Sequence, residues 1–487
     1  MSKCFLSIIF SLLFTFSFSQ PGTWLAVYGG TNYDRGKGIC QTYDNGFAVC
    51  GTTSSYGMGN TDFYLMKINS AGKFLWERTF GDVNIENAFS IQQTNDSGFV
   101  ICGYTNSFGN GGYDTYLVKT DSLGNFQWGK AYGGSDWDFG YWAEQTNDGG
   151  YILCGETFSY GNSNQAYLVK TNSNGDSLWT KNFGSTGIEI AKEVHQTNDA
   201  GFVFAGQTTS DTGGIDAYLV KTDSNGNLLW EKSFGNSADN TANAIAITSD
   251  KKFLLGGYSY VGTEKKNYFI KTDSAGSLLN LVIDSGGSGN REIYRIRENK
   301  EGDYFIAGWL DAISGNAKEF SFSKWNSGFW FLTGGTAGGP YDEEAYDIVE
   351  TSDSGYAIVG YTGTFGVGVD NILILRTNKN MSYTNTVNSY VSTNELAEAE
   401  ENISVYPNPF CENLFISLNP GVFSNEKKIM IAISDLTGKE IISEEKEILP
   451  QQISIKIPSG KFNSGIYFLN ISSKEKSFHK KLTFFSH

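Results

Sequence analysis

The sequence is poor in histidine and arginine. It has three histidines in 487 residues, and two of them, His479 and His487, lie near the C-terminus. His195 alone precedes them, so the long N-terminal region lacks the residues for a multi-histidine metal site or a Ser-His-Asp triad. The six arginines are too few and too scattered for a site in which three of them surround one carboxylate. We therefore expect no metal, no cofactor and no catalytic residue.

Charge and long apolar runs are also scarce. Charged residues make up 18% of the chain, and 52 acidic against 36 basic residues give a net charge of −16. Such a charge argues against nucleic acid and anionic membranes as partners. After residue 19 no run of 18 apolar residues occurs, so we expect no transmembrane segment.

Cysteine is the third scarce residue, with six in the chain. Cys50, Cys102 and Cys154 recur at one position of a repeat, where other copies have Ala, Gly or Val, and this favours small core residues over metal ligands. Cys40 and Cys50 face each other across a predicted hairpin, so a strained disulfide is the less favoured alternative.

The N-terminus has the pattern of a secretory signal peptide. Lys3 precedes the apolar run FLSIIFSLLFTF, and small residues follow up to Ser19. We predict that residues 1–19 are removed. Cys4 precedes the apolar run, which argues against a lipoprotein cleavage site.

A repeat of 51 or 52 residues occupies the chain from residue 24 to about 380. Each copy has a glycine ending its second strand, a basic residue ending its third, and usually a tryptophan in its fourth. The glycines are Gly51, Gly103, Gly155, Gly206, Gly257, Gly308 and Gly360. The basic residues are Lys67, Lys119, Lys170, Lys221, Lys271, Lys324 and Arg376. The fourth-strand positions are Trp24, Trp76, Trp128, Trp179, Trp230, Asn280 and Trp330.

Each copy predicts four antiparallel strands. Segments such as GFVICGYT and DTYLVKT are rich in β-branched and aromatic residues, and turns such as Asn95–Gly98 supply Asx and Gly where a hairpin needs them. Such units at this period are typical of propeller blades. The mature chain opens with a fourth strand, and the last copy lacks one. We therefore predict an all-β fold with a seven-bladed propeller over residues 20–380, closed by its N-terminal strand; an open β-solenoid is the alternative.

Candidate binding residues follow from the loops. Connections between strands two and three, and between blades, are long and variable and should share one face of the disc. Aromatic and acidic residues there suit a glycan or a polypeptide, although the aromatics could simply cap the blades. The candidates are Tyr33, Asp34, Trp137, Asp138, Trp142 and Tyr341.

Two further interpretations concern charged residues. The basic residue ending each third strand is expected to pair with a turn Asp, a structural role. Carboxylates such as Asp138 with Glu144, or Glu343 with Asp347, could meet at the ring centre and act on a glycosidic bond. Their spacing is not diagnostic, and we expect a protein that is not an enzyme.

The repeat ends in a polar, acidic linker over residues 381–401, and a second domain occupies residues 402–487. Alternating segments such as ISVYPNPF, IAISDLTGKEI, ISIKIP and SGIYFLNI predict the strands of a small Ig-like β-sandwich.

Two resemblances add to these predictions. YPNPF, D-x-TGKE, GIYFL and the final KLTF, in that order, resemble the type A C-terminal sorting domain of type IX secretion substrates. This implies export across an outer membrane, recognition of residues 402–487 by the translocon and a sortase-like peptidase, and cleavage in the linker. KTDSNGNLLW (221–230) is similar to segments of kelch-type and quinoprotein-type propellers, and the repeat resembles one found in secreted bacterial propeller proteins.

Together these patterns predict an extracellular or cell-surface protein that binds or adheres to a glycan or a protein. The alternatives are a carbohydrate-active enzyme with carboxylates at the propeller centre and a purely structural surface component.

Overall fold

The computed structural model describes residues 22–383 apart from 162, 185, 210–213, 285 and 313–316, then 387–391, and eight segments of the tail: 403–406, 413–418, 428–434, 440–447, 453–458, 461–462, 465–472 and 477–484. The predicted signal peptide (1–19), most of the predicted linker and Cys411 lie outside the described residues. The chain divides into two compact units between Tyr390 and Val391. No helix among the described residues is long and apolar enough to cross a membrane.

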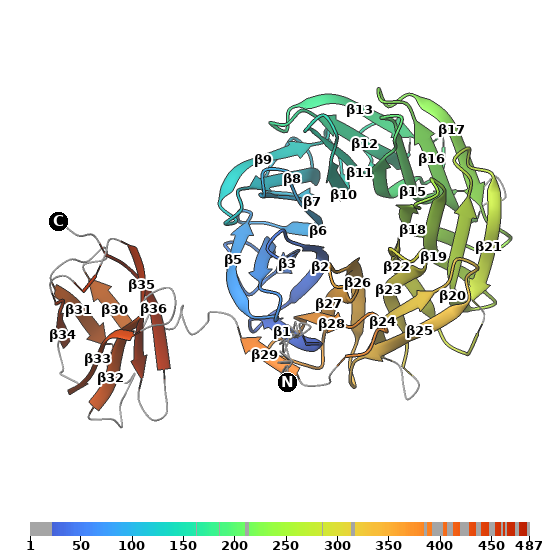
Figure 1. Ribbon diagram of the computed structural model, residues 1–487. Helices are drawn as coiled ribbons and strands as arrows, with labels where there is room; N and C mark the ends of the chain where they lie inside the picture. Colours follow the sequence, from blue (N-terminus) through green and yellow to red (C-terminus); the bar gives the residue numbers. More distant parts are fainter. Residues whose placement is uncertain are drawn as a thin grey trace, which may run out of the picture. The chain divides into compact units, whose positions relative to one another are not determined.

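The first unit consists of seven antiparallel sheets arranged in a ring (Figure 1). Each sheet is one blade, and in six of the seven the strand order follows the chain. The innermost strands are β2 (Asp34–Gln41), β6 (Glu86–Gln93), β10 (Asp138–Gln145), β14 (Ile190–Gln196), β18 (Asn240–Ile247), β22 (Arg291–Glu298) and β26 (Glu343–Glu350). The second strands are β3 (Phe47–Thr53), β7 (Phe99–Thr105), β11 (Tyr151–Thr157), β15 (Phe202–Thr209), β19 (Phe253–Val261), β23 (Tyr304–Asp311) and β27 (Tyr356–Thr362).

The third strands are β4 (Asp62–Ile68), β8 (Asp114–Thr120), β12 (Gln165–Thr171), β16 (Ile215–Thr222), β20 (Glu264–Thr272), β24 (Lys318–Trp325) and β28 (Asn371–Thr377). The outermost strands are β5 (Phe74–Phe80), β9 (Phe126–Tyr132), β13 (Ser177–Phe183), β17 (Leu228–Phe234), β21 (Leu278–Asp284), β25 (Phe331–Ala337) and, in blade 7, β1 (Trp24–Gly29). Blade 1 begins at β2. The predicted seven-bladed propeller is confirmed.

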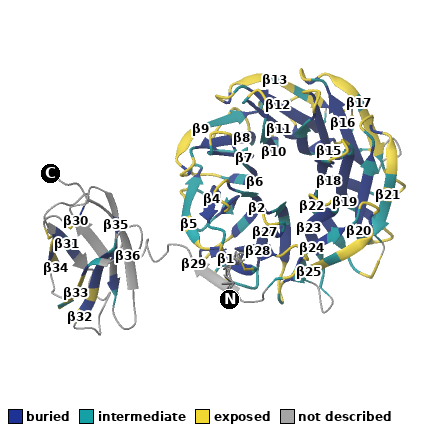
Figure 2. Ribbon diagram, viewed as in Figure 1, coloured by how far each residue is buried: buried dark blue, intermediate teal, exposed yellow. Residues whose placement is uncertain are grey.

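Burial follows position in the blade. Four third strands, β4, β8, β12 and β28, are buried at every residue because each packs against a neighbouring blade on both faces. The outermost strands carry most of the exposed residues (Figure 2). The apolar runs of the repeat are therefore strands buried on two sides, which is why they lack a polar alternation.

The N-terminal strand closes the ring. Strand β1 pairs antiparallel with β28, with Trp24 opposite Arg376, and so supplies the fourth strand of blade 7. This confirms the predicted closure. Strand β29 (Val387–Val391), from the predicted linker, adds a fifth strand beside β1. The propeller sheet therefore extends past residue 380.

The basic residue ending each third strand is structural, as predicted. Lys119 Nζ lies 2.8 Å from Asp96 Oδ2, in the turn that joins the first two strands of its blade. The same contact joins Lys67 to Asp44 at 3.0 Å, Lys170 to Asp148 at 2.9 Å and Lys221 to Asp199 at 3.0 Å. In these four blades the pair ties one hairpin to the next, whereas Lys271 Nζ of blade 5 donates to the Tyr304 hydroxyl of blade 6 at 2.6 Å.

The four described cysteines are free. The register of the first hairpin pairs Cys40 with Ala48 and Gly38 with Cys50. Cys40 and Cys50 are therefore not opposite each other, as the sequence pattern had suggested. Cys50, Cys102 and Cys154 are buried among apolar neighbours, which agrees with their prediction as core residues.

The fourth-strand tryptophans pack against the next blade. A Cβ placed on Gly124, in the last turn of blade 2, would lie 2.4 Å from the Trp76 ring of blade 1. This glycine has a φ of 76°, so it is favoured both by its left-handed conformation and by the ring that covers it. The same pair forms at five junctions: Trp24 with Gly72, Trp76 with Gly124, Trp128 with Gly175, Trp179 with Gly226, and Trp230 with Gly276.

Two junctions lack the tryptophan, and bulky turn residues replace the glycine there. Blade 5 has Asn280 opposite Lys271, and the blade 6 turn has Phe329 at a φ of 64°. Phe329 is 4% exposed and stacks on Phe269 of blade 5, with ring centroids 5.1 Å apart. We infer that Phe329 occupies volume that the missing tryptophan leaves.

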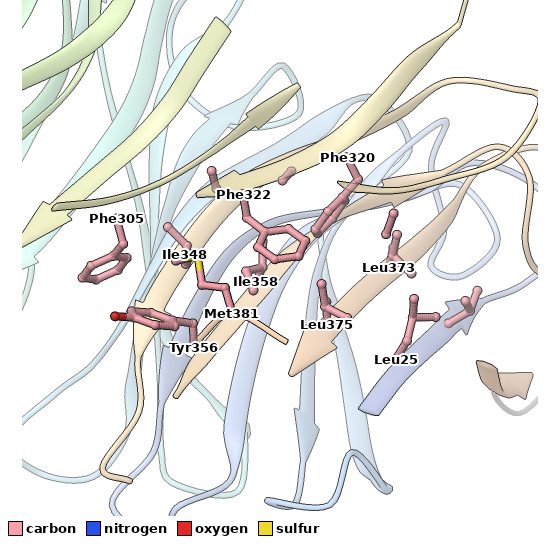
Figure 3. Packing of buried hydrophobic residues seen from close by; sticks show 14 residues of the cluster. Leu25, Phe305, Phe320, Phe322, Ile348, Tyr356, Ile358, Leu373, Leu375 and Met381 are labelled. Carbon is pink, nitrogen blue, oxygen red and sulfur yellow. The ribbon is translucent and has the colours of Figure 1, made fainter. Parts of the chain in front are cut away.

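The second such junction joins blades 6 and 7. The structure places Thr333 opposite Lys324, so Thr333 and not Trp330 holds the fourth-strand position. The assignment of Trp330 to that position was wrong; Trp330 ends the preceding turn and is 74% exposed. Met381, with a φ of 57°, takes the glycine position of the blade 7 turn. It is buried beside Phe322 and Tyr356 (Figure 3).

The second unit is a small β-sandwich, as predicted. One sheet contains β30 (Ile403–Tyr406), β31 (Asn413–Leu418) and β34 (Ile453–Lys456); the other contains β33 (Glu440–Glu447), β32 (Lys428–Ser434), β35 (Gly465–Ser472) and β36 (Ser477–Phe484). The core is mostly aliphatic, with Leu414, Ile431, Ile455 and Leu469 fully buried. Strands β31 and β33 were not predicted from the sequence.

Candidate functional site

The long connections gather on one face of the propeller. The Phe158 amide, in a connection between second and third strands, donates to Trp137 O at 2.8 Å, in the connection between blades 2 and 3. Asp138 N donates in turn to Tyr113 O of blade 2 at 2.7 Å. These bonds tie each connection to the next. We call this surface the long-loop face.

The predicted site residues Asp34 and Asp138 are buried beneath this face, at 1% and 0% exposure. Asp138 Oδ2 accepts from Gly134 N at 2.8 Å and from Ser159 Oγ at 2.5 Å. Asp34 accepts from the equivalent Gly30 N and Ser55 Oγ at 2.8 and 2.6 Å. Their carboxylates hold the loops in place, because buried backbone amides need acceptors, and do not face outward.

The three predicted aromatic residues of the loops are exposed: Tyr33 by 53%, Trp137 by 50% and Tyr341 by 63%. Tyr33 and Tyr341 lie in the connections leading into blades 1 and 7, and no ring contact among the described residues joins either to Trp137. Trp137 has aromatic neighbours of its own, with ring centroids 6.0 Å from Tyr113 and 6.2 Å from Phe158. Trp137 therefore belongs to an aromatic group on this face, which we call the aromatic surface around Trp137.

A row of aromatic rings runs inward from this surface. The centroid of Trp137 lies 6.3 Å from that of Phe139, and Phe139 lies 4.9 Å from Tyr104. Phe89 follows, 5.6 Å from Tyr104 and 5.5 Å from Tyr141. Phe89 and Tyr141 belong to the innermost strands β6 and β10. The row therefore leads from the long-loop face to the centre of the ring.

At the centre, one side chain from each innermost strand surrounds a chamber of 210 Å³. The seven occupy the same strand position: each is the unpaired residue at a register shift that recurs in every innermost strand. We call this space the channel chamber. Its lining is Lys37, Phe89, Tyr141, Lys192, Asn243, Tyr294 and Tyr346, with Arg295 beside them.

Two lysines of the channel chamber lie over tyrosine rings. Lys37 Nζ is 3.2 Å from the Tyr346 centroid, and Lys192 Nζ is 4.1 Å from that of Tyr141. Neither ammonium group forms an ion pair with a carboxylate that the structure describes. Loss of hydration lowers the pKa of Lys37 to about 7 and also lowers that of Lys192. The chamber is therefore suited to an anionic or hydroxyl-bearing group.

Farther along the innermost strands, a network of ion pairs joins blades 3, 4, 6 and 7. Glu193 is 0% exposed, and Oε2 lies 2.9 Å from Arg295 Nη1 while Oε1 lies 2.5 Å from Arg297 Nη2. Arg295 Nε lies 2.9 Å from Asp347 Oδ1. His195 completes the network, with Nδ1 2.8 Å from Glu144 Oε2 and Nε2 3.0 Å from Glu193 Oε1.

Trp142 belongs to this network and not to the long-loop face. It lies on β10, with the Arg295 guanidinium carbon 4.3 Å from its ring centroid and His195 5.9 Å away. The indole covers the ion pairs from one side and limits their hydration. Its position explains why it departs from the repeat without being a surface residue.

The network shifts two pKa values in opposite directions. Burial alone would lower the pKa of His195, but the carboxylates of Glu144 and Glu193 outweigh it and raise that pKa to about 9. Burial alone would raise the pKa of Glu193, but Arg295, Arg297 and His195 hold it well below its usual range. Both groups are therefore charged near neutral pH.

This arrangement predicts a pH dependence of stability that belongs to His195. Its folded pKa of about 9 exceeds the ordinary 6.5, so the imidazolium stabilises the fold fully below pH 6.5, and that contribution is lost as the pH rises through about 9. We expect the stability advantage of the wild type over His195→Gln to shrink by roughly 2–3 kcal/mol between about pH 6 and pH 9.5.

Urea unfolding of both proteins at the two pH values measures this difference. The lowered pKa of Lys37 changes the free energy of unfolding in the opposite direction over pH 7 to 10. Because Lys37 is present in both proteins, its contribution cancels in the difference between them. An advantage that does not change with pH would contradict the assignment of the charge to His195.

The carboxylates considered for catalysis do not meet. Asp138 and Glu144 lie six residues apart on β10, about 20 Å along a strand, and Glu343 and Asp347 lie four apart on β26, about 13 Å. Paired carboxylates that cleave glycosidic bonds lie about 5–10 Å apart. Asp138 and Glu343 are also engaged by loop amides. Neither pair has the geometry of that chemistry.

Comparisons with known proteins agree with the two-domain organisation. Residues 404–484 match the family model of the secretion system C-terminal sorting domain. This tail implies export by type IX secretion, and hence a secreted or cell-surface protein. A comparison with curated protein sequences finds no match.

Solved structures similar to the chain include β-propellers. The crystal structure of Sqt1 from Chaetomium thermophilum covers 72% of this chain and 98% of its own, with 10% identity and a TM-score of 0.41. The β-propeller domain of the Trilobed protease from Pyrococcus furiosus covers 74% of this chain and 97% of its own, with 11% identity and a TM-score of 0.39.

Proposed function

We propose that the exported propeller is a glycan-binding protein and that the aromatic surface around Trp137 holds the glycan. The observation that carries this proposal is a half-exposed tryptophan that Tyr113, Phe139 and Phe158 contact edge to face, on loops fixed by buried carboxylates. Sugar rings present C–H faces that stack on such rings while their hydroxyls bond to polar neighbours.

The channel chamber supports a ligand that carries a carboxylate. The aromatic row leads from Trp137 to Tyr141, which lines the chamber together with Lys37 and Lys192. Neither lysine forms an ion pair with a carboxylate among the described residues. A carboxylate at the end of a glycan would supply the missing counter-charge. The net charge of −16 opposes a long polyanion, so we favour a glycan with isolated acidic units.

The test is a binding screen of the whole mature chain, from residue 20, against neutral and acidic polysaccharides. The whole chain is used because β29 belongs to the blade 7 sheet. We expect saturable binding to at least one polysaccharide without release of sugar. Release of reducing sugar would instead indicate an enzyme, and a screen without saturable binding would favour a protein partner or a structural role; either result contradicts the proposal.

A further inference from the structure

Blade 6 departs from the repeat at two neighbouring positions of its third strand. The residue opposite the repeat glycine is a tyrosine in five blades, as in the pairing of Tyr116 with Gly103, and is Ser321 opposite Gly308 in blade 6. The position two residues on is apolar in the other six blades and is Ser323 here. The five tyrosines are Tyr64, Tyr116, Tyr167, Tyr218 and Tyr268.

The repeat tyrosine fills the space between blades. Tyr116 of blade 2 packs on Phe63 of blade 1, with centroids 5.3 Å apart, and its hydroxyl covers Gly129 of the outermost strand. In blade 6 the residue equivalent to Gly129 is Gly334, so the space that a tyrosine ring occupies in blade 2 is also present in blade 6. Ser321 is too small to fill that space. The result is a cavity of 410 Å³ between blades 5 and 6.

The lining of this cavity, which we call the interblade cavity, combines rings with uncharged polar groups. Trp325 and Phe331 meet edge to face, with centroids 5.6 Å apart. Ser321, Ser323 and Thr336 bring hydroxyls from blade 6, and Asn267 brings an amide from blade 5.

The charges in the interblade cavity are already compensated. Arg291 Nη1 lies 3.2 Å from Asp284 Oδ2, and Glu292 pairs with Lys265 at 2.8 Å. Arg291 Nε is buried and has no hydrogen-bond acceptor among the described residues. A buried donor without an acceptor is costly. The group that would complement this cavity is therefore neutral and accepts hydrogen bonds.

We propose that the interblade cavity is a second binding site, which takes a neutral saccharide of one or two units. Its volume lies in the range of small-molecule sites, about 300–1,000 Å³. Sugar hydroxyls would accept from Arg291 Nε and exchange hydrogen bonds with the serines, while the ring packs on Trp325 and Phe331. The site is independent of Trp137 and of the glycan proposed for the long-loop face.

The test restores the repeat by Ser321→Tyr. The probes are glucose, galactose, mannose, N-acetylglucosamine, maltose and cellobiose, each titrated against the whole mature chain by saturation-transfer NMR. We expect at least one to bind saturably to the wild type. Filling the cavity should raise the melting temperature, because a ring replaces a void, and should weaken that binding by roughly tenfold or more.

Two further variants test whether a loss of sugar binding arises from the interblade cavity itself. Arg291→Lys keeps the charge beside Asp284 but removes the Nε–H donor, and should weaken binding roughly 3- to 10-fold. Glu301→Gln changes a side chain that is 64% exposed and does not line the cavity, so it should leave the affinity unchanged. If none of the six sugars binds, or if binding persists within about twofold in both Ser321→Tyr and Arg291→Lys, the proposal is overturned.

Discussion

Replacing Glu193 with glutamine is expected to lower the free energy of unfolding of the propeller by roughly 3–5 kcal/mol. The Glu193 carboxylate has no exposed surface, and it lies within 3.0 Å of Arg295, Arg297 and His195. It also accepts from Ile245 N of blade 5 at 2.9 Å. Glutamine keeps the shape but removes the negative charge, so a net positive charge stays buried.

Chemical denaturation of the whole chain, followed by tryptophan fluorescence, measures the loss. Glu301→Gln is the matched control, because the Glu301 side chain is 64% exposed and its contact with Lys324 spans 3.7 Å. That change should alter stability by no more than about 0.5 kcal/mol. A loss below about 1 kcal/mol in Glu193→Gln would show that the network does not hold the blades together.

Replacing Phe329 with glycine should cost roughly 2–4 kcal/mol of stability. Deleting a buried Phe side chain removes about 3–5 kcal/mol of packing, and relief of the left-handed conformation at a φ of 64° returns about 1 kcal/mol. The void should open between Phe269 and Tyr304, whose ring centroids lie 5.1 and 5.4 Å from that of Phe329.

The double variant Asn280→Trp with Phe329→Gly tests whether Phe329 fills the volume that the repeat tryptophan occupies at other junctions. It recreates the Trp and Gly pair of five other junctions, so it should recover at least half of the stability lost in Phe329→Gly. Asn280→Trp alone should be destabilising, because Phe329 and the new indole compete for one volume. Additive losses in the double variant would contradict the exchange of volume between the two positions.

The fold was largely predictable because marker residues at fixed positions of the repeat indicate where its strands end. The glycine, lysine and tryptophan positions indicated four-stranded units, and the incomplete first and last copies indicated closure by the N-terminal strand. The error at Trp330 has a physical cause. Within a hairpin the tryptophan lies nine residues after the lysine, as Trp128 follows Lys119, whereas distances between blades vary with loop length. Counting from Lys324 reaches Thr333.

The site was predictable only at its surface. Trp137 stands out in a variable loop, and it is exposed as expected. Asp138, one residue later, begins β10 and turns inward, and no pattern in the sequence separates the two roles. The register shift in each innermost strand interrupts the alternation of side chains, so the sequence pattern does not show which of them face the centre. Glu193 and Arg295 lie about a hundred residues apart, so only closure of the ring could bring them together.

The most direct test of the account compares two exposed tryptophans. Trp137 is 50% exposed on the long-loop face, and Trp330 is 74% exposed in a short turn between third and fourth strands, at the opposite end of its blade. With a polysaccharide captured by the wild type, Trp137→Ala should weaken binding by roughly tenfold or more, and Trp330→Ala should leave it within about twofold. Equal affinities in the two variants, or a greater loss in Trp330→Ala, would contradict a glycan site on the long-loop face.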